Sequence, residues 1–559
     1  MADPSSTHQT APQRVSAEDL AARQRDISVS AFFLRNRHLL GFDTPAKALV
    51  TAVKEAVDNA IDACEDAGIL PEIAVRITRR GRIYTVAVTD NGPGILEPQI
   101  GRIFGKLLYG SRFHKLSQSR GQQGMGIAAA GMYGQLTTGE PVHILSRVES
   151  EAKATALYVA IDTEKNRPDV HRKKHVEWDH PHGTRVEIML EGHLQGGQHS
   201  VETYLRQTAI ANPHVTIRYE GLEGRIRDYP RTVESLPPVP KEIKPHPHGI
   251  ELGRLIQMLN ATRSRTLMQF LINDFSSVGK KTAAQIIKAA GKRLSDRSYP
   301  KHTAHAQAVA LHRAMDETRI PAPRTDCIVP IGEPQLLKGL RAEVSADFYT
   351  VTTRPAAIHR GNPFQVEVAI AYGHPGETPA GAVAGGDGVS THENERIDLL
   401  RLRDEPAMLL RFANRVPLLY QQSSCAITKA VIQTNWRSYG LRQPKGVLPI
   451  GPMAILVHLA SVWVPYTSES KEAIEPSPEI TKEIVLGLQH CGRELSHYLA
   501  RKTRQRHEIE RRAYIETYLP HIAAALQDIL SLSDEDRDKT LARLDAVLRA
   551  GRRKQGDAS

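Results

Sequence analysis

The chain has 559 residues, which at about 150 residues per domain corresponds to roughly three or four domains and excludes a lone binding module. Lysine and arginine number 73 and aspartate and glutamate 62, so the formal net charge is +11. This basic excess favours a polyanionic partner, but it does not separate nucleic acid from membrane lipid or simple solubility. A content of 40% hydrophobic and 24% charged residues excludes wholesale disorder.

Targeting and metal-binding signals are missing from the sequence. There is no run of about 18 apolar residues and no apolar core of a signal peptide. We therefore expect a cytoplasmic protein, nucleoid-associated in a prokaryote, with no membrane partner. The cysteines lie far apart without a CxxC pair, and the histidines have no ligand spacing, which predicts free thiols and no zinc. The cysteines are Cys64, Cys327, Cys425 and Cys491.

The N-terminal part of the chain predicts a mobile arm followed by an α+β domain. Residues 1–26 are rich in Ser, Thr, Pro, Gln and Ala and form the arm. Apolar periodicity predicts a long helix at 44–67, and β-patterned runs predict a hairpin at 72–89. Further strand-like runs, LYVAID, VEIML and VTIRYE, follow. We assign this domain to residues 27–235.

A proline-rich linker separates this domain from a helical one. Residues 236–248 contain five prolines, which exclude a continuous helix or a central strand there. Apolar residues then recur at helical spacing as far as about residue 300. We assign this small helical domain to residues 236–305.

The remainder of the chain predicts a second α+β domain and a long helix. Strand-like runs PFQVEVAIAYG, RVPLLYQ and AILVHLASVWV lie within residues 306–478. From 479 to about 513 there is no proline, and the later half of that segment is strongly basic. Gly487 and Gly492 each weaken such a helix by about 1 kcal/mol without forbidding it. We assign residues 479–559 to a stalk helix and a C-terminal tail.

Glu55 and Asn59 form the first motif that could carry chemistry. They lie four residues apart in the predicted helix, so they stack one turn apart on one side. The asparagine could offer its amide oxygen to Mg²⁺ while the glutamate polarises a water, as nucleotide hydrolysis requires. Taken alone, the pair is more simply a solvated helix face.

The second motif follows the second strand of the predicted hairpin. Asp90 stands at the strand end, and Gly92 and Gly94 follow it. The glycines allow the backbone to close under a flat ligand, and the carboxylate can accept a hydrogen bond from an exocyclic amine such as that of adenine. Taken alone, the sequence DNG is an ordinary turn.

The third motif is a glycine-rich run that leads into an alanine-rich helical segment. Residues 120–127 read RGQQGMGI. A glycine-rich loop before a helix N-terminus presents N–H groups and the positive end of the helix dipole to phosphates. The run does not follow a strand in a short βαβ unit, which disfavours a dinucleotide fold, and the absence of GxxxxGK[ST] excludes a P-loop.

In this order the motifs resemble the ATP-binding region of the GHKL superfamily, which includes gyrase, the heat-shock chaperone, sensor histidine kinases and mismatch-repair ATPases. The resemblance implies a Bergerat-type α/β sandwich that binds ATP and Mg²⁺. It makes Glu55 the general base, Asn59 the Mg²⁺ ligand and Asp90 the adenine reader, with Gly92 and Gly94 shaping the base pocket. It assigns the phosphate lid to Arg120, Gly121, Gln122, Gln123, Gly124, Met125, Gly126 and Ile127.

Flanking segments narrow the resemblance to the B-subunit family of DNA topoisomerase VI over about residues 26–514. They read SVSAFFLRNRHLLGFDTPAKAL, FGKLLYGSRFHKLSQSRGQQGMGIAAAGMYGQLTTG and FLINDFSSVGKKTAAQI. The resemblance places a nucleotide-contacting pair at Ser111 and Arg112. It implies an α+β multidomain fold: a GHKL ATPase domain with an N-terminal strap, a helix-two-turns-helix domain, and an α/β transducer domain with a long C-terminal helix.

The resemblance also suggests where DNA is contacted. One place is the basic run of the helical domain, including Lys280 and Lys281, although a packing module with solubilising lysines is equally consistent with that run. The other is the family's tryptophan-lysine-x-tyrosine motif, which corresponds here to Trp436, Arg437 and Tyr439. Arginine at 437 keeps the positive charge but carries it on a forked guanidinium group, so we expect the geometry of the DNA contact to differ.

Lys445 is the candidate for the lysine that reports the state of the nucleotide. It lies two residues after Gln443, where the resemblance places the switch lysine of the superfamily. A cation reaching the γ-phosphate from a second domain would stabilise charge in the transition state. The alternative is an ordinary loop lysine.

The resemblance implies the ATP-hydrolysing subunit of a type IIB DNA topoisomerase. Two copies would dimerise on binding Mg-ATP, with residues 24–40 reaching across to the partner, and trap a DNA duplex. A separate DNA-cleaving A subunit, in an A2B2 heterotetramer, would then cleave and pass double-stranded DNA to relax supercoils and decatenate. Tyr420, Tyr439 and Tyr514 have no clustered carboxylates around them, so this chain is not expected to cleave DNA itself.

Three other functions share some of these features. A chaperone or mismatch-repair type ATPase would act on protein clients and would leave the helical domain unexplained. A non-hydrolysing DNA-binding scaffold is disfavoured by the complete set of Glu55, Asn59, Asp90 and the lid. A sensor kinase is disfavoured because no membrane span or phosphoacceptor-histidine helix precedes the ATP-binding motifs.

Overall fold

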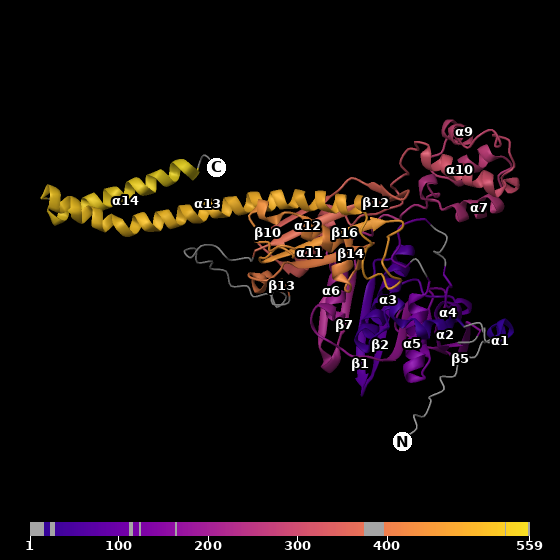
Figure 1. The fold of residues 1–559 in the computed structure, drawn as a ribbon. Coiled ribbons are helices and arrows are strands. Elements are labelled where there is room, and N and C mark those ends of the chain that lie inside the picture. Colours follow the sequence, from indigo (N-terminus) through magenta and orange to yellow (C-terminus); the bar gives the residue numbers. More distant parts are fainter. Residues whose placement is uncertain are drawn as a thin grey trace, which may run out of the picture.

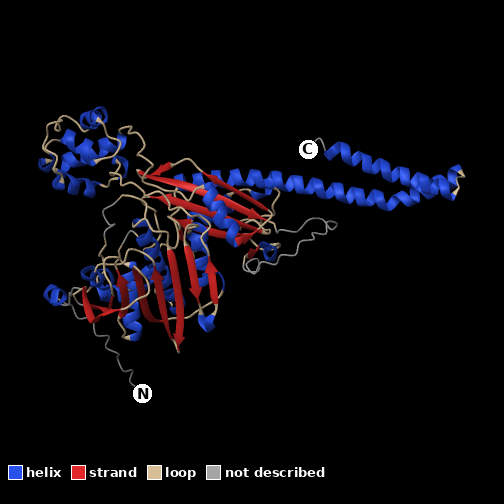
Figure 2. Cartoon of the chain, turned by 180° about the vertical axis from the view of Figure 1, so that it is seen from behind, coloured by secondary structure: helices blue, strands red, loops and turns tan. Residues whose placement is uncertain are grey.

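The described residues form two large β-sheets, a small two-stranded sheet, a compact helical unit and a long helical hairpin (Figures 1 and 2). In Figure 1 the helical unit α7–α10 lies beyond one end of the second sheet, and the tip of the hairpin extends beyond the other. The computed structural model describes residues 16–22, 28–110, 116–121, 124–162, 165–373, 396–531 and 533–556. Ser111, Arg112, Gln122 and Gln123 therefore lie outside the described residues.

The first sheet is eight-stranded, with the order β5-β4-β3-β6-β2-β1-β7-β8. All neighbours are antiparallel except β1 and β7. The strands are β1 (Glu72–Arg80), β2 (Ile83–Asp90), β3 (Val142–Arg147), β4 (Ala154–Asp162), β5 (Arg167–Val176), β6 (Gly183–Glu191), β7 (Thr216–Glu220) and β8 (Ile226–Tyr229). The hairpin expected at 72–89 is confirmed as β1 and β2.

Helices pack on one another and on this sheet, with α3 on β2, α5 on β6 and α4 on β4 and β5. The helix expected at 44–67 is confirmed as α3, which begins where the Thr44 hydroxyl accepts a hydrogen bond from the Lys47 N–H and Pro45 occupies the first turn. The helices are α1 (Ala17–Ala22), α2 (Val29–Arg35), α3 (Pro45–Asp66), α4 (Glu97–Gly105), α5 (Gly126–Thr138) and α6 (Val201–Ala211).

The helical unit has a hydrophobic core of its own. It consists of α7 (Leu252–Ala261), α8 (Leu267–Asp274), α9 (Lys280–Ala289) and α10 (His305–Glu317). Leu311 and Met315 of α10 are fully buried in the same cluster as Phe270 and Ile286. The helical unit therefore extends beyond residue 305, where the sequence pattern placed its end, because α10 supplies one wall of its core.

The second sheet is six-stranded, with the order β10-β12-β16-β14-β15 and β11 paired to β12. Its central strand β16 is buried at every position, as expected for a strand covered on both faces. The elements of this part of the chain are α11 (Glu333–Glu343), β9 (Val344–Ser345), β10 (Phe348–Thr353), β11 (Ala357–His359), β12 (Asn362–Tyr372), β13 (Ile397–Asp398), β14 (Met408–Ala413), β15 (Val416–Pro417), α12 (Ala426–Gln433) and β16 (Met453–Ser461). The short strands β9 and β13 pair with each other in parallel as a separate two-stranded sheet.

The long helix α13 (Pro478–Leu530) packs on this sheet and then leaves it to pair with α14 (Asp534–Gly556). It is longer than the sequence pattern indicated and includes Pro520. Its glycines mark close approaches: a Cβ would lie 2.7 Å from Val368 at Gly487 and 2.7 Å from the Tyr439 ring at Gly492. These glycines lower helix propensity but allow the helix to lie against the sheet.

The two sheets are joined through α6 and α11, which pack against each other. Ile210 and Ala211 of α6 belong to the same buried cluster as Leu336 and Leu340 of α11. A Cβ at Gly339 would lie 2.3 Å from the Ile210 carbonyl oxygen. Only a glycine therefore allows the helices to approach this closely.

The four cysteines are free and buried, as the sequence predicts. Within the described ranges, no helix combines the length and the apolar character needed to cross a bilayer.

Substituting glycine by alanine in two helices tests the joint between the sheets. Alanine favours a helix over glycine by about 1 kcal/mol, and a Cβ at Gly253 meets nothing within 4 Å. Gly253→Ala should therefore leave the free energy of unfolding unchanged or raise it. Gly339→Ala should lower it by about 1–3 kcal/mol, because the added methyl overlaps a backbone carbonyl. Guanidinium denaturation measures both; equal effects would contradict the close packing at the joint.

Candidate functional site

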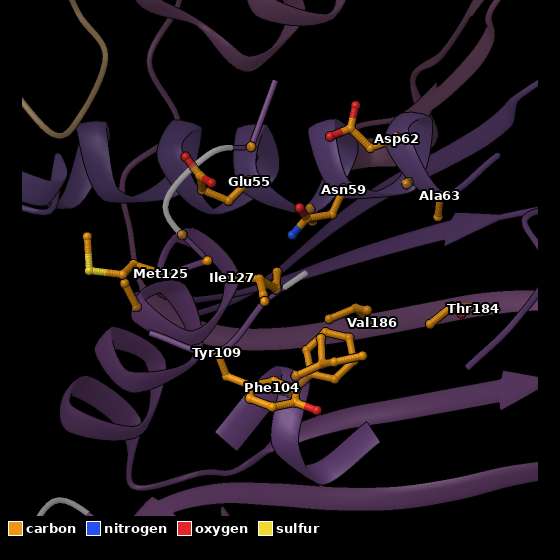
Figure 3. A pocket seen from close by; sticks show the side chains of 18 of the residues that line it. Glu55, Asn59, Asp62, Ala63, Phe104, Tyr109, Met125, Ile127, Thr184 and Val186 are labelled. Carbon is orange, nitrogen blue, oxygen red and sulfur yellow. The ribbon is translucent and has the colours of Figure 1, made fainter. Parts of the chain in front are cut away.

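A cavity of about 630 Å³ lies between α3, α5 and the first sheet, and the three sequence motifs meet there. Glu55, Asn59, Asp90 and Gly94 line it. In Figure 3 Asn59 points into the space between its helix and the strand that carries Thr184 and Val186. Five residues of the predicted lid also line the cavity: Gly121, Gly124, Met125, Gly126 and Ile127.

Glu55 is ionised because two lysines lie close to it. The Lys54 ammonium donates a hydrogen bond to Glu55 Oε1 at 3.0 Å. Burial raises the pKa of Glu55, but the charges of Lys54 and Lys471 outweigh burial and hold the pKa below its usual value. The carboxylate is therefore present at neutral pH and can accept a hydrogen bond from a water.

Gly126, the first residue of α5, makes room for Glu55. A Cβ at this position would lie 1.7 Å from Glu55 Oε2. The missing side chain lets the N-terminal end of α5 approach the carboxylate and leaves its first N–H groups facing the cavity. The glycine thus brings a potential base and a potential phosphate site into one place.

Asn59 lies one turn beyond Glu55 on α3. Its side chain is exposed to the cavity and makes no hydrogen bond within the described part of the chain. Mg²⁺ in nucleotide sites is held by few protein oxygens and by the phosphates. A single free amide oxygen fits such a site, and the described residues contain no cluster of His, Cys, Asp or Glu that would form a separate metal site.

Asp90 ends β2 and is 8% exposed. Its Oδ1 accepts hydrogen bonds from the Gly92 N–H at 2.8 Å and the Thr184 N–H at 3.1 Å. Burial raises the pKa of Asp90 to about 6, although these hydrogen bonds oppose the shift. Both hydrogen bonds fall on Oδ1, so Oδ2 remains available to a donor in the cavity.

The two glycines after Asp90 are required by close contacts. Gly94 has a φ of +75°, and a Cβ there would lie 2.1 Å from the Arg147 carbonyl oxygen. A Cβ at Gly92 would lie 2.9 Å from Asp90 Oδ1. A side chain at either position would therefore displace the loop that follows Asp90.

The Arg120 side chain does not join the lid, contrary to the sequence-based expectation. It is 5% exposed and points away from the cavity, toward the far side of α3. Its guanidinium donates to Asp62 at 2.8 Å and to both oxygens of Glu65 at 2.6 and 2.8 Å. Its charge is thus compensated by carboxylates of α3 on the side away from the cavity.

Lys445 does not reach the cavity either. It is exposed in a loop after Gln443, and it is not among the cavity-lining residues. A different lysine, Lys471, which no sequence motif singled out, lies at the cavity. It comes from the segment between β16 and α13, lines the cavity and is 7% exposed.

Lys471 contacts the ATP-binding motifs directly. Its ammonium donates to the Arg120 carbonyl oxygen at 2.8 Å. Burial lowers its pKa, and the Glu55 carboxylate opposes that shift. The sequence contains one signal for it: a lone cation in the polar run TSESKE, which lies between the buried strand β16 and the long helix α13.

The candidate DNA contacts differ in accessibility. Trp436 is 0% exposed and its indole N–H donates to the Val431 carbonyl at 2.8 Å, so it is a core residue and not a surface contact. Tyr439 packs against Gly492 of α13. Arg437 is exposed, as are Lys280 and Lys281 in the first turn of α9.

Family models match both sheet-containing parts of the chain. Residues 44–192 match the model described as histidine kinase-, DNA gyrase B-, and HSP90-like ATPase. Residues 323–511 match the model described as topoisomerase VI B subunit, transducer.

Curated relatives are similar over almost the whole chain. The B subunit of type 2 DNA topoisomerase 6 from Archaeoglobus fulgidus is 44% identical over 534 residues, which is 95% of this chain and 84% of the relative. The protein of the same name from Methanococcoides burtonii is 44% identical, covering 94% of this chain and 81% of its own length. A solved gyrase B subunit from Myxococcus xanthus aligns with a TM-score of 0.39 and 11% identity over 84% of this chain and 95% of its own, which supports no conclusion. The chain therefore belongs to the family of type 2 DNA topoisomerase 6 B subunits, the GHKL-type ATPase subunits of type IIB topoisomerases.

Proposed function

We propose that the cavity binds Mg-ATP and that Glu55 is the general base of its hydrolysis. The observation that carries this proposal is the ionised Glu55 carboxylate, held by Lys54 and Lys471 at the wall of the cavity that also contains Asn59 and Asp90. A carboxylate in that state orients a water and accepts its proton as the phosphoryl group is transferred.

Asp90 suits the adenine end of the nucleotide. Its Oδ1 is fixed by two backbone N–H groups, which leaves Oδ2 to accept from the exocyclic amine. Ile95, Phe104 and Val186 supply apolar surface along the same cavity, on which a flat base can pack.

Asn59 and the start of α5 suit the phosphate end. The N–H groups in the first turn of α5 have no side-chain cap and can donate to phosphate oxygens. Asn59 would hold Mg²⁺, which would screen the charge of the phosphates when bound. Ser111, Arg112, Gln122 and Gln123 stay predicted nucleotide contacts.

Lys471 is the residue that we propose as the switch lysine, in place of Lys445. It reaches the cavity from the segment after the second sheet, so it can report the presence of a γ-phosphate to the transducer part of the chain. The negative charge of a phosphate would stabilise its charged form against burial.

The partners of the chain follow from its family. We propose that two copies dimerise on ATP, trap double-stranded DNA and act with a DNA-cleaving A subunit as an A2B2 heterotetramer in the cytoplasm, associated with the nucleoid in a prokaryote. On α2, Phe33 is buried in its own domain while Phe32 is 52% exposed, which suits a strap that contacts a second copy. Exposed Lys280, Lys281 and Arg437 suit contacts with a DNA backbone.

We also propose a division of the chain into functional domains. An ATPase domain occupies residues 27–235, a helix-two-turns-helix domain runs from 236 to about 320, the transducer follows to 478, and a stalk with its tail completes the chain. The shared core of α7–α10 supports the boundary near 320.

Co-purification with a candidate A subunit tests the function as a whole. The complex should relax supercoiled plasmid only with ATP and Mg²⁺, and neither subunit should do so alone. Relaxation without ATP, or an ATPase rate unchanged by DNA, would contradict the proposal.

Replacing Glu55 tests the base. Gln has nearly the same shape, so Glu55→Gln still fits beside Gly126, but it cannot accept a proton. The turnover number should fall by about 10²–10⁴-fold, while affinity for a non-hydrolysable ATP analogue stays within about twofold, because the amide leaves the pocket shape unchanged. Steady-state kinetics and calorimetry measure the two quantities; turnover near the wild-type rate would remove Glu55 from this role.

Lys471→Ala and Lys445→Ala form a matched pair. Losing a buried cation at the transferring phosphate should lower the turnover number by about 10²-fold. Losing an exposed loop lysine should leave ATP turnover unchanged. Single-turnover hydrolysis compares the two variants, and the reverse ranking would restore Lys445 as the switch lysine.

The pH dependence of nucleotide binding tests Asp90. Its carboxylate form, which accepts from adenine, exists above a pKa of about 6. Affinity for ATP should therefore be constant above about pH 7 and fall by up to about tenfold per pH unit below the pKa. The Asp90→Asn variant has no titrating group at this position. Its pH profile therefore shows the contribution of the nucleotide's own phosphates, which is subtracted from the wild-type profile. Identical profiles for the two proteins would contradict the assignment.

A further inference from the structure

A buried chain of hydrogen bonds runs from the helix of the ATP site into the core of the second sheet. It starts at Arg120, which precedes the glycines of the lid. Besides its bonds to Asp62 and Glu65 of α3, the guanidinium donates to Asn212 Oδ1 at 2.5 Å. Asn212 caps α6 and is fully buried. Asp62 is less than one turn beyond Asn59 on α3, so this cluster fixes the helix next to the proposed Mg²⁺ ligand.

Asn212 extends this series of hydrogen bonds to the second sheet. Its amide nitrogen donates to the Thr208 carbonyl at 2.8 Å and to the Arg415 carbonyl at 3.1 Å. Its oxygen thus binds Arg120 in the first domain, and its nitrogen also binds Arg415 of the second sheet. An amide is the side chain that supplies both a donor and an acceptor in this way.

Asn414 makes a second crossing beside the first. Its amide nitrogen donates to the Ser119 carbonyl at 3.2 Å and to the Ser461 carbonyl at 2.9 Å. Ser119 directly precedes Arg120, whose own carbonyl accepts from Lys471. The root of the lid is therefore held at successive residues by groups from the transducer side.

The Asn414 and Arg415 hairpin has an unusual backbone. Both residues have positive φ, 47° and 68°, in the tight turn between β14 and β15. Such a turn matches the twist of a hairpin, but its left-handed conformation is costly for a long side chain such as arginine. The surrounding contacts must hold it in place.

His458 and Glu367 supply those contacts. The Arg415 N–H donates to His458 Nε2 at 3.0 Å, so Nδ1 carries the proton and donates to Glu367 Oε2 at 2.7 Å. Both side chains are 0% exposed. Burial lowers the pKa of His458, consistent with a neutral ring. Glu367 also accepts from the Ile331 and Gly332 N–H groups, both at 2.7 Å.

We propose that Asn212 and Asn414 are positioning residues for ATP hydrolysis. They fix the root of the lid and the end of α3 to a hairpin that the His458 and Glu367 pair keeps rigid. Neither asparagine lines the nucleotide cavity, so both act through Ser119 and Arg120. The inference rests on the ATPase role proposed above and adds that turnover depends on the second sheet through these two amides as well as through Lys471.

Isosteric Asn→Asp variants of the full chain test this inference. Asn212→Asp keeps the oxygen that accepts from Arg120 but turns the donor to the Arg415 carbonyl into a repelling oxygen. Asn414→Asp likewise loses the donor to the Ser119 carbonyl and keeps the oxygen that accepts from the Ser461 N–H at 2.9 Å. Asn166→Asp is the matched control: it also loses an amide bond to a carbonyl, that of Leu107 at 3.3 Å, but entirely within the first domain.

The two variants should lower the turnover number for ATP by about ten- to a hundred-fold, the effect of a small misplacement of catalytic groups. The affinity for a non-hydrolysable ATP analogue should stay within about twofold of the wild-type value. The turnover number is calculated per site that binds the analogue, so that unfolded molecules do not contribute to it. Turnover per site at the level of Asn166→Asp in both variants would overturn the inference, whether or not their melting temperatures fall. A wild-type chain that hydrolyses no ATP would instead overturn the ATPase proposal, and this inference with it.

Discussion

The buried guanidinium of Arg120 is the interaction on which the rest of this structure depends. A buried charge of this kind costs several kcal/mol unless carboxylates and hydrogen bonds compensate it, and here Asp62, Glu65 and Asn212 together do so. The Glu65 and Asp62 carboxylates raise the pKa of Arg120 despite its burial, so it is charged. Because these partners come from α3 and α6, the lid cannot be displaced at its root without breaking the cluster. The nucleotide site therefore depends on this buried cluster of ion pairs as well as on the glycine-rich loop.

Around the Arg120 cluster, the absence of a side chain at several glycines allows other groups to approach closely. Gly126 admits the Glu55 carboxylate to the start of α5, and Gly94 lets the loop after Asp90 lie against the Arg147 carbonyl. Gly339 lets α11 meet α6, and Gly492 seats α13 against Tyr439. The glycines thus serve packing in two senses: in the cavity they make room for ligand chemistry, and between domains they bring backbones into contact. Both uses sacrifice local stability for a close approach.

The second sheet takes part in the ATP site through more than one group. Lys471 lines the cavity itself, and Asn414 donates to the Ser119 carbonyl just before Arg120. The Arg415 carbonyl accepts from Asn212, which in turn binds Arg120. The strand β16 that carries His458 also pairs with β12, on which α13 packs. The residues that bind the root of the lid are therefore connected through β16 and β12 to the long helix α13. Such rigid, bonded contact is what a transducing element needs.

The sequence by itself determined the local elements and the chemistry of the motifs. Helical spacing placed Glu55 and Asn59 on one side of α3, and the strand pattern placed Asp90 at the end of β2, because both periods are properties of the backbone. Family resemblance then suggested the roles that we propose for them. Only the tertiary structure decided which cations face the cavity: it turned Arg120 toward α6, buried Trp436, left Lys445 in solvent and brought in Lys471. The direction of a charged side chain depends on partners far away in the chain, such as Asn212, and no local pattern encodes them.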